Sequence, residues 1–254
     1  DVYEKGTLTE FKNWYGNSST FYGQFKNKTN PIVGNHEYEG NAAPGYFSYW
    51  DNIPHYYSYN DAGWHFIALD STSQYGQLTP GTAQYDWLEN DLRTNTQPCT
   101  LAYFHHPTFS IGPNGDTTRM NPIWSLFNTW GVDLVLNGHD HDYQRWLPLD
   151  ANGNPSPTGV TEFVVGTGGH GVQNFVRTDG RVVKQIGTVP EGIGALKLAL
   201  GAGSATYEFK NGSGVQDSGS VSCAPSSSDS NTCAVKSPYC VGIRASDTRR
   251  TSFS

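Results

Sequence analysis

The sequence predicts an α/β fold in which helices flank a sheet, and two observations support this class. Short apolar runs alternate with runs of helical periodicity over residues 64–136, and three of the apolar runs end in a histidine-containing motif. In such sheets, ligands bind just beyond the carboxyl ends of the strands. We therefore expect these histidines to lie together at one edge of the sheet.

Four apolar runs predict strands of this sheet: residues 31–33, 64–69, 100–104 and 132–136. Two helices are predicted between them, over residues 82–93 and 121–130. In the first helix, Tyr85, Leu88 and Leu92 recur on one face. In the second, an apolar stripe ends at Gly131, a residue type that terminates helices because it tolerates left-handed backbone.

The second half of the chain predicts another sheet and a tail. Strands are expected at residues 161–165, 196–200 and 205–209, packed as a second sheet on the first. Residues 211–231 are rich in Ser and Gly, which predicts a linker, and residues 232–254 form a small cysteine-containing tail. The predicted organisation is one domain over residues 1–210, followed by this linker and tail.

Composition argues against two classes of partner. The 254 residues carry a net charge of -7, and Lys and Arg form no cluster that could neutralise a phosphate backbone, so no nucleic-acid partner is expected. No apolar stretch approaches the roughly 20 residues that a membrane-spanning helix requires. A membrane partner is therefore not expected either.

The four cysteines favour disulfides, because none shows the CxxC spacing of a structural zinc site. We expect Cys233 and Cys240 to pair with each other or to tie the tail to Cys223 or Cys99. Together with the low lysine content, this predicts a secreted or extracytoplasmic protein. No signal peptide precedes Asp1, so either it has been removed or more than a signal is missing.

His139 and His141 form the first candidate metal site. Residues two apart point to the same side of an extended segment, so both imidazoles could reach one metal site. The alternative is a polar surface turn. Gly138 permits a tight turn before the pair, and Asp140 and Asp142 could orient the two rings by accepting hydrogen bonds from them.

Two further motifs could complete such a site. His105 and His106 follow the predicted strand 100–104, and one of them could be a third nitrogen ligand; the alternative is a histidine at the edge of the core that donates to a backbone carbonyl. Asn35 could be a turn residue or a neutral carbonyl ligand that leaves the charge of a divalent ion uncancelled. His36 could then contact a bound anion or protonate a leaving group.

Taken together, these motifs resemble the calcineurin-like metallophosphoesterases. Three blocks occur in the order of that family: Gly34-Asn35-His36-Glu37, His105 after a strand, and Gly138-His139-Asp140-His141. Two further stretches are similar to the purple acid phosphatases in particular: Tyr3-Glu4-Lys5-Gly6 to the end of their GDxxY block, and Asp142-Tyr143-Gln144-Arg145 to the residues after their GHxH block. The likeness covers residues 3–210 and implies a sandwich of two mixed β-sheets flanked by helices.

The resemblance also implies a centre of two metal ions. Asn35, His105 and His139 would bind a divalent ion (Zn, Fe or Mn), and His141 and Tyr3 would bind the other ion, Fe(III). By the same likeness, His36 would contact the phosphate and assist departure of the leaving group. His106 is the second catalytic candidate, with a role beside the metal or the substrate.

The implied reaction is hydrolysis of phosphate monoesters, with a small phosphorylated molecule as substrate. Two alternatives stay open, because a fold does not fix a substrate. One is a phosphodiesterase or nucleotidase on the same fold. The other is a non-catalytic binding protein with a degraded metal site.

The sequence departs from the family at its beginning. The DxG block of the family has no counterpart before Asp1, and the metal-bridging aspartate of the second block would lie one position before it. We therefore expect a fold whose N-terminal part is missing, and a missing N-terminal segment or a second chain that completes the centre.

Overall fold

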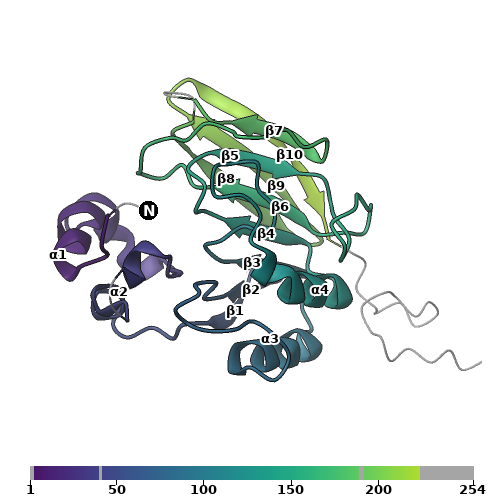
Figure 1. The fold of residues 1–254 in the computed structure, drawn as a ribbon, viewed down its shortest axis with the longest axis horizontal. Coiled ribbons are helices and arrows are strands. Elements are labelled where there is room, and N and C mark those ends of the chain that lie inside the picture. The colour runs from purple at the N-terminus through teal and green to yellow at the C-terminus, as the bar shows by residue number, and fades with distance from the viewer. Residues whose placement is uncertain (1–2, 40–41, 189–191, 224–254) are drawn as a thin grey trace, which may run out of the picture.

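The computed structural model describes residues 3–39, 42–188 and 192–223. A seven-stranded mixed sheet packs on a three-stranded antiparallel sheet, and two helices cover the other face of the larger sheet (Figure 1). The predicted fold class, an α/β sandwich of two sheets flanked by helices, is confirmed.

The larger sheet has the strand order β1-β2-β3-β4-β6-β5-β7. Its strands are β1 (Tyr57–Asp61), β2 (Trp64–Ala68), β3 (Cys99–Tyr103), β4 (Leu134–Asn137), β5 (Tyr143–Trp146), β6 (Thr161–Val165) and β7 (Val182–Ile186). The strands β2, β3, β4 and β6 are parallel neighbours, whereas β1 pairs antiparallel with β2, and β5 with β6 and β7. Four parallel strands therefore end at the same edge, where loops can share a site.

The smaller sheet consists of β8 (Gly194–Gly201), β9 (Ser204–Asn211) and β10 (Gly214–Ser222). Tyr207 and Phe209 of β9 pack against Leu101 and Leu134 of the larger sheet. The predicted linker is wrong over residues 214–222, because β10 pairs with β9 along its length. Residues 224–231 of the predicted linker, and the tail that follows them, lie outside the described residues.

The helices α3 (Ala83–Thr94) and α4 (Asn121–Trp130) cover the opposite face of the larger sheet, with the short turn η4 (Thr118–Met120) before α4. Strand periodicity explains the two faces: Ala102 and Val135 belong to the core under the helices, whereas their neighbours in the chain pack toward the smaller sheet. Gly131 ends α4 with left-handed backbone, φ 66°, as predicted.

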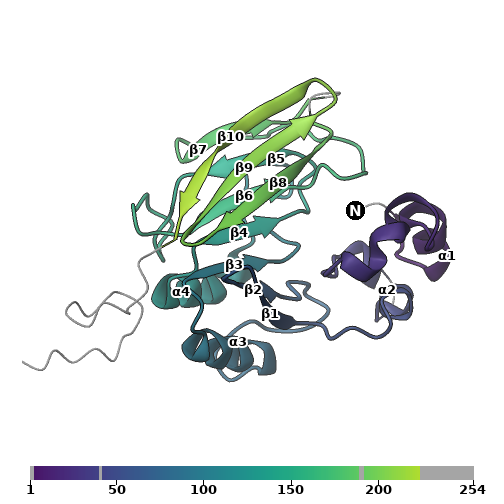
Figure 2. The same ribbon diagram turned by 180° about the vertical axis from the view of Figure 1, so that it is seen from behind.

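The N-terminal part is made of short helical turns: α1 (Leu8–Glu10), η1 (Phe11–Tyr15), η2 (Phe21–Lys28), η3 (His36–Tyr38) and α2 (Pro44–Tyr49). It lies beside the larger sheet (Figure 2) and has its own aromatic core, in which the rings of Phe11 and Tyr49 stack 5.0 Å apart. The strand predicted at residues 31–33 is wrong. Pro31 cannot donate to a ladder, and β3 and β4, whose side chains lie beside Ile32, already pair on both edges.

A disulfide joins Cys99 in β3 to Cys223, the residue after β10, with Cα atoms 5.3 Å apart. The prediction that cysteines of this chain form disulfides is confirmed for this pair. A bond from the tail to Cys99 or Cys223 is wrong, because these two bind each other. The possible pair of Cys233 and Cys240 lies outside the described residues.

No helix within the described ranges is long and apolar enough to span a bilayer.

Candidate metal centre

The predicted histidine motifs lie at the carboxyl ends of parallel strands. β3 leads into His105, and β4 leads into His139 and His141. Because β3 and β4 are neighbours, both motifs emerge on the same edge of the sheet. Asn35 reaches this edge from the loop before η3 and not from a strand, which corrects the expectation that each motif ends a strand.

Three of the predicted ligands converge on one point. Oδ1 of Asn35 lies 2.6 Å from Nε2 of His105 and 3.1 Å from Nδ1 of His139. The two nitrogens are themselves 3.1 Å apart. Ligands at about 2.0–2.1 Å from a tetrahedral zinc ion lie about 3.3 Å from one another. The spacing of the oxygen and the two nitrogens, 2.6–3.1 Å, is therefore close to the spacing of three donors around one divalent ion.

Both histidines are held in the form that binds metals. Burial lowers the pKa of His105 well below its usual value, and the neighbouring His106 and His139 add to this effect. Burial also lowers the pKa of His139 to about 4, against the opposing charge of Asp140. The rings are thus neutral at physiological pH, and a neutral imidazole has the lone pair that a metal needs.

Close packing fixes Asn35 against this pair. The buried carboxylate of Glu37 accepts a hydrogen bond from the backbone N–H of Gly34 at 2.7 Å. A Cβ at Gly34 would lie 2.8 Å from Nδ1 of His105. A side chain at this position would therefore push the loop away from the ring, and glycine lets Asn35 reach its partners.

In the turn that carries His139, a different residue from the predicted one has left-handed backbone. His139 itself has left-handed backbone, with φ 66°. Gly138, which was expected to supply this conformation, has no positive φ, and a Cβ there would meet His105 at an ordinary 3.7 Å. A non-glycine residue in this region is strained, as is common where a side chain must point at a ligand.

The two aspartates beside these histidines hold the loops and not the rings. The Asp140 carboxylate accepts hydrogen bonds from the Ser110 hydroxyl and from the N–H of Asn114, the latter at 2.9 Å. Asp142 accepts from Gln144 at 2.9 Å. The expectation that Asp140 and Asp142 orient the histidine rings is therefore wrong.

A second group of histidines lies next to the first. The rings of His141 and His170 are 4.5 Å apart, and those of His36 and His170 are 6.0 Å apart. Nδ1 of His141 donates to the carbonyl of Gly171 at 3.0 Å, which leaves the lone pair on Nε2. Nδ1 of His36 donates to the carbonyl of Glu4 at 2.9 Å. The predicted ligand His141 and the predicted acid His36 thus share one neighbourhood.

His170 is a residue of this group that the sequence analysis missed. It follows β6, the fourth of the parallel strands, and it is exposed. Its ring nitrogen lies 3.8 Å from a carboxylate oxygen of Glu4. Its position in the sequence could have identified it, because it lies five residues after a buried strand and directly after Gly168-Gly169.

Tyr3 lies in the aromatic core of the N-terminal part. Its ring centroid is 4.2 Å from that of Phe11, and only 9% of its surface is exposed. Burial, and then the charge of Glu37, raise the pKa of Tyr3 above its usual value. Its role as a metal ligand stays a prediction, because a phenolate at this position needs a cation to offset those effects.

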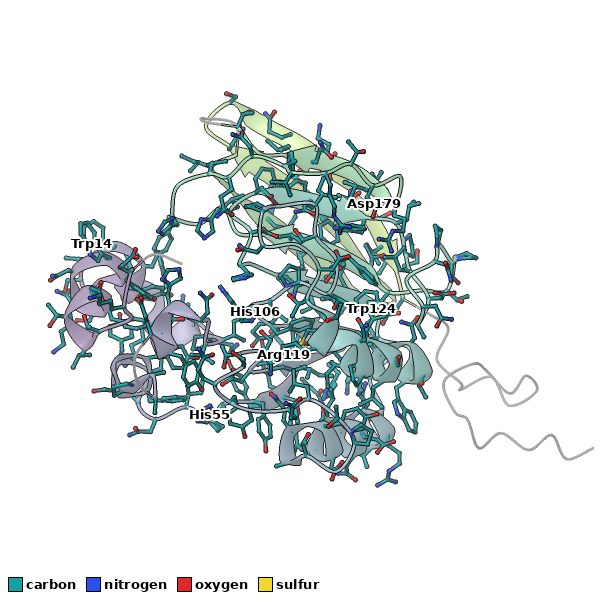
Figure 3. The ribbon with its side chains drawn as sticks, in the orientation of Figure 1. Trp14, His55, His106, Arg119, Trp124 and Asp179 are labelled. Atoms are coloured by element: carbon teal, nitrogen blue, oxygen red, sulfur yellow. A yellow bond between two sulfur atoms is a disulfide. The ribbon has the colours of Figure 1, made fainter. Side chains whose placement is uncertain are left out.

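His106, the second catalytic candidate, lies against the first group. Its ring centroid is 4.4 Å from that of His139 and 4.9 Å from that of His105. Figure 3 shows it at the edge of the sheet that faces the N-terminal helices. Burial, and then the charges of His139 and Arg119, lower the pKa of His106 to about 3, so this ring is also neutral.

Comparison with known proteins agrees with these observations. A family model described as calcineurin-like phosphoesterase matches residues 1–143. Purple acid phosphatase 18 of Arabidopsis thaliana is 33% identical over 117 residues, which are 43% of this chain and 25% of that protein. The purple acid phosphatase of Glycine max is 39% identical over 90 residues, 32% of this chain and 18% of the relative. The chain thus spans about a quarter or less of the length of these relatives.

Solved structures share the fold at lower identity. The purple acid phosphatase PPD1 from yellow lupin superposes with a TM-score of 0.68 at 20% identity, over 85% of this chain and 42% of that one. GAP50, the anchor in the inner membrane complex of Plasmodium, superposes with a TM-score of 0.64 at 13% identity, over 87% of this chain and 75% of that one. With the family match over more than half of its residues, the chain belongs to the calcineurin-like phosphoesterases, and within them it resembles the purple acid phosphatases.

Proposed function

We propose that this chain carries part of a binuclear metal centre that hydrolyses phosphate monoesters. The observation that supports it most is the convergence of Asn35, His105 and His139 within 2.6–3.1 Å of one another, beside the group that contains His141 and His36. Buried neutral imidazoles and a neutral amide oxygen are donors suited to a divalent ion.

In this proposal Asn35, His105 and His139 hold the divalent ion, which is Zn, Fe or Mn. His141 and Tyr3 belong to the second ion, Fe(III). When bound, two such ions draw charge from the phosphoryl group and acidify the water that attacks it. The chain's own residues bind the substrate, position it and move protons.

His36 is the proposed acid for the leaving group. Its Nδ1 donates to the Glu4 carbonyl, so the proton that it can transfer sits on Nε2 of the imidazolium. An alkoxide that leaves from phosphorus takes this proton and departs as an alcohol. The ring of His170, 6.0 Å away, lines the same space.

The second ion needs more ligands than His141 and Tyr3. The resemblance assigns two aspartates to this ion, from blocks that the sequence does not hold in full. We propose that these carboxylates come from a further N-terminal segment or from a second chain. Elemental analysis of the protein purified from its source should give two metal ions per catalytic unit, and its intact mass should exceed 27.9 kDa or include a second polypeptide.

The main test is turnover of p-nitrophenyl phosphate, with and without a chelator. We expect hydrolysis that chelation abolishes and added metal restores, and a visible phenolate-to-iron absorption band if Tyr3 binds ferric iron. Bis(p-nitrophenyl) phosphate discriminates the phosphodiesterase alternative: faster turnover of the diester than of the monoester would contradict the proposal.

The fold likeness to a Plasmodium anchor protein supports a second candidate, a non-catalytic binding protein. A secreted or extracytoplasmic setting fits either candidate, since the Cys99–Cys223 disulfide is stable in an oxidising environment. Metal content separates the two: a protein that binds no metal at the Asn35 group favours the binding role.

A further inference from the structure

Ser71 and His106 occupy equivalent places on two neighbouring strands. β2 and β3 are parallel, and their register pairs Ala68 with Tyr103. Ser71 and His106 each lie three residues beyond this pair. Ser71 is fully buried, and no motif in the sequence predicts a role for it. The two residues meet at the edge where the histidine motifs emerge.

Two hydrogen bonds join them. The backbone N–H of His106 donates to Oγ of Ser71 at 2.9 Å, and Oγ of Ser71 lies 2.9 Å from Nδ1 of the His106 ring. A hydroxyl has one proton to donate. Among the described residues, Nδ1 of His106 is the acceptor within reach of this hydroxyl. The Ser71 proton therefore lies on the bond to Nδ1, and the ring proton lies on Nε2.

The position of Ser71 is itself fixed from both sides. The Asp70 carboxylate accepts hydrogen bonds from the N–H and the hydroxyl of Thr72, at 2.9 and 2.6 Å. The amide of Gln84 bonds both polar atoms of the Asp70 backbone at 2.8 Å. Arg119, which Figure 3 shows next to His106, donates to the Ser71 carbonyl at 2.7 Å. An oriented hydroxyl loses little entropy when it holds the ring.

This position of the ring proton decides whether His106 can bind a metal ion together with His105 and His139. One ring nitrogen of His106 lies within 4.8 Å of ligand atoms of His105 and His139, so the three residues could be taken for a metal site. A nitrogen that carries a proton cannot bind a metal, and Nδ1 is occupied by Ser71. His106 is therefore a donor beside the Asn35, His105 and His139 group and not a fourth member of it.

We propose, on the basis of the proposed function, that Ser71 is a positioning residue that holds the His106 ring in the tautomer whose Nε2–H donates to a phosphoryl oxygen of the substrate. His106 and His36 then differ in the protonation state in which their Nε2 can donate. The Nδ1 of His36 is itself a donor, so His36 can donate from Nε2 only as an imidazolium. His106 donates from Nε2 without an added proton, and it stabilises charge on the phosphoryl group without transferring a proton.

Long-range ¹H–¹⁵N correlation of the full chain, labelled with ¹⁵N-histidine and loaded with zinc, tests the tautomer directly. The His106 signals, identified by their loss in His106→Gln, should show a protonated Nε2 and an unprotonated Nδ1. Addition of inorganic phosphate should shift the Nε2 signal. In Ser71→Ala the tautomer should change or become mixed, whereas Ser71→Thr and the exposed control Ser73→Ala should keep it. A protonated Nδ1 in the unmodified chain, or an unchanged tautomer in Ser71→Ala, would overturn the inference.

Activity and metal content provide the second arm. Ser71→Ala should lower kcat for p-nitrophenyl phosphate about tenfold, with zinc content unchanged and most of the rate regained in Ser71→Thr. Loss of zinc in His106→Gln to the extent seen in His139→Ala would show that His106 is a ligand and overturn the inference. A complete catalytic unit, purified from its source with two metal ions bound, that turns over no substrate would refute the proposed function, whereas the tautomer and its phosphate response would still decide the role of Ser71.

Discussion

Because His139 has left-handed backbone, its proposed role as a metal ligand and its effect on stability can be tested separately. A non-glycine residue in this region is strained by roughly 1 kcal/mol, and His139 has φ 66°. We predict that His139→Ala and His139→Gly both lose the divalent ion. In urea denaturation of the metal-free proteins, the glycine variant should be more stable than the alanine variant by about 1 kcal/mol. Equal stabilities would show that the turn is not strained.

Metal affinity should depend on the converging residues and not on histidine in general. We predict that Asn35→Ala and His105→Ala each weaken zinc binding by at least about tenfold, because each removes one of three donors. His55→Ala is the matched control, since its ring packs on Phe47 at 4.4 Å and bonds Asp70. Competition with a chromogenic chelator gives the affinities. A control variant that loses metal equally would refute the assignment.

At the scale of residues, the sequence predicted which side chains gather at this edge of the sheet better than it predicted the contacts that support them. Asn35, His105, His139 and His141 could be found because their motifs have a fixed order and spacing. Ser71 could not, because serine is common and its partner is 35 residues away in sequence. The hydrogen-bond partners of Asp140 and Asp142 could not be predicted either. A carboxylate accepts hydrogen bonds from whichever donors the folded loops place beside it.

A half-buried ion pair joins the last strand, β10, to the larger sheet. Asp217 accepts hydrogen bonds from Nε of Arg145 at 2.7 Å and from the Tyr143 hydroxyl at 2.8 Å. Burial tends to raise the pKa of Asp217, but the bonds from Arg145 and Tyr143 outweigh it and hold this pKa below its usual value. The pair therefore stabilises the fold above the unfolded pKa of about 3.9, and this contribution is lost as the pH falls through the folded pKa.

We predict that Asp217→Asn lowers the free energy of unfolding by about 1–2 kcal/mol at neutral pH. The difference from the unmodified protein should shrink as the pH is lowered below about 4. Glu208→Gln, on the exposed pair of Glu208 with Lys210, is the control and should leave the stability nearly unchanged. A difference that persists unchanged in acid would show that the charge of Asp217 is not the cause.

At the scale of elements, both predicted helices and six of the seven predicted strands correspond to observed elements, because their apolar periodicity is strong. The strands β1, β5, β7 and β10 were missed. β10 is Ser- and Gly-rich, and its residues are mostly exposed or half-buried, so it lacks the alternation that marks a strand. The apolar run that begins at Pro31 is the opposite case, because it was predicted as a strand and does not form one. A short apolar run forms a strand only where a neighbouring strand has an unpaired edge.

For the whole molecule, the Cys99–Cys223 disulfide cross-links the two sheets, and 124 residues separate its cysteines. We predict that the double variant Cys99→Ser, Cys223→Ser unfolds with a free energy lower by about 2–5 kcal/mol, because the unfolded chain regains the entropy of that loop. Calorimetry of both proteins with and without reductant measures this. Reductant should destabilise the unmodified protein more than the double variant, and an equal response would contradict the prediction.

The same bond makes a covalent ring of the chain from residue 99 to residue 223. His105, His139 and His141 lie within this covalent ring, whereas Asn35 lies in the segment of the chain that precedes it. A single protease cut at the exposed residues 168–170 would open the ring without dividing the molecule, and the product would migrate as one species until the sulfurs are reduced. A cut between residues 36 and 99 would instead sever Asn35 from the three histidines, so the parts of the proposed metal centre differ in how they survive proteolysis.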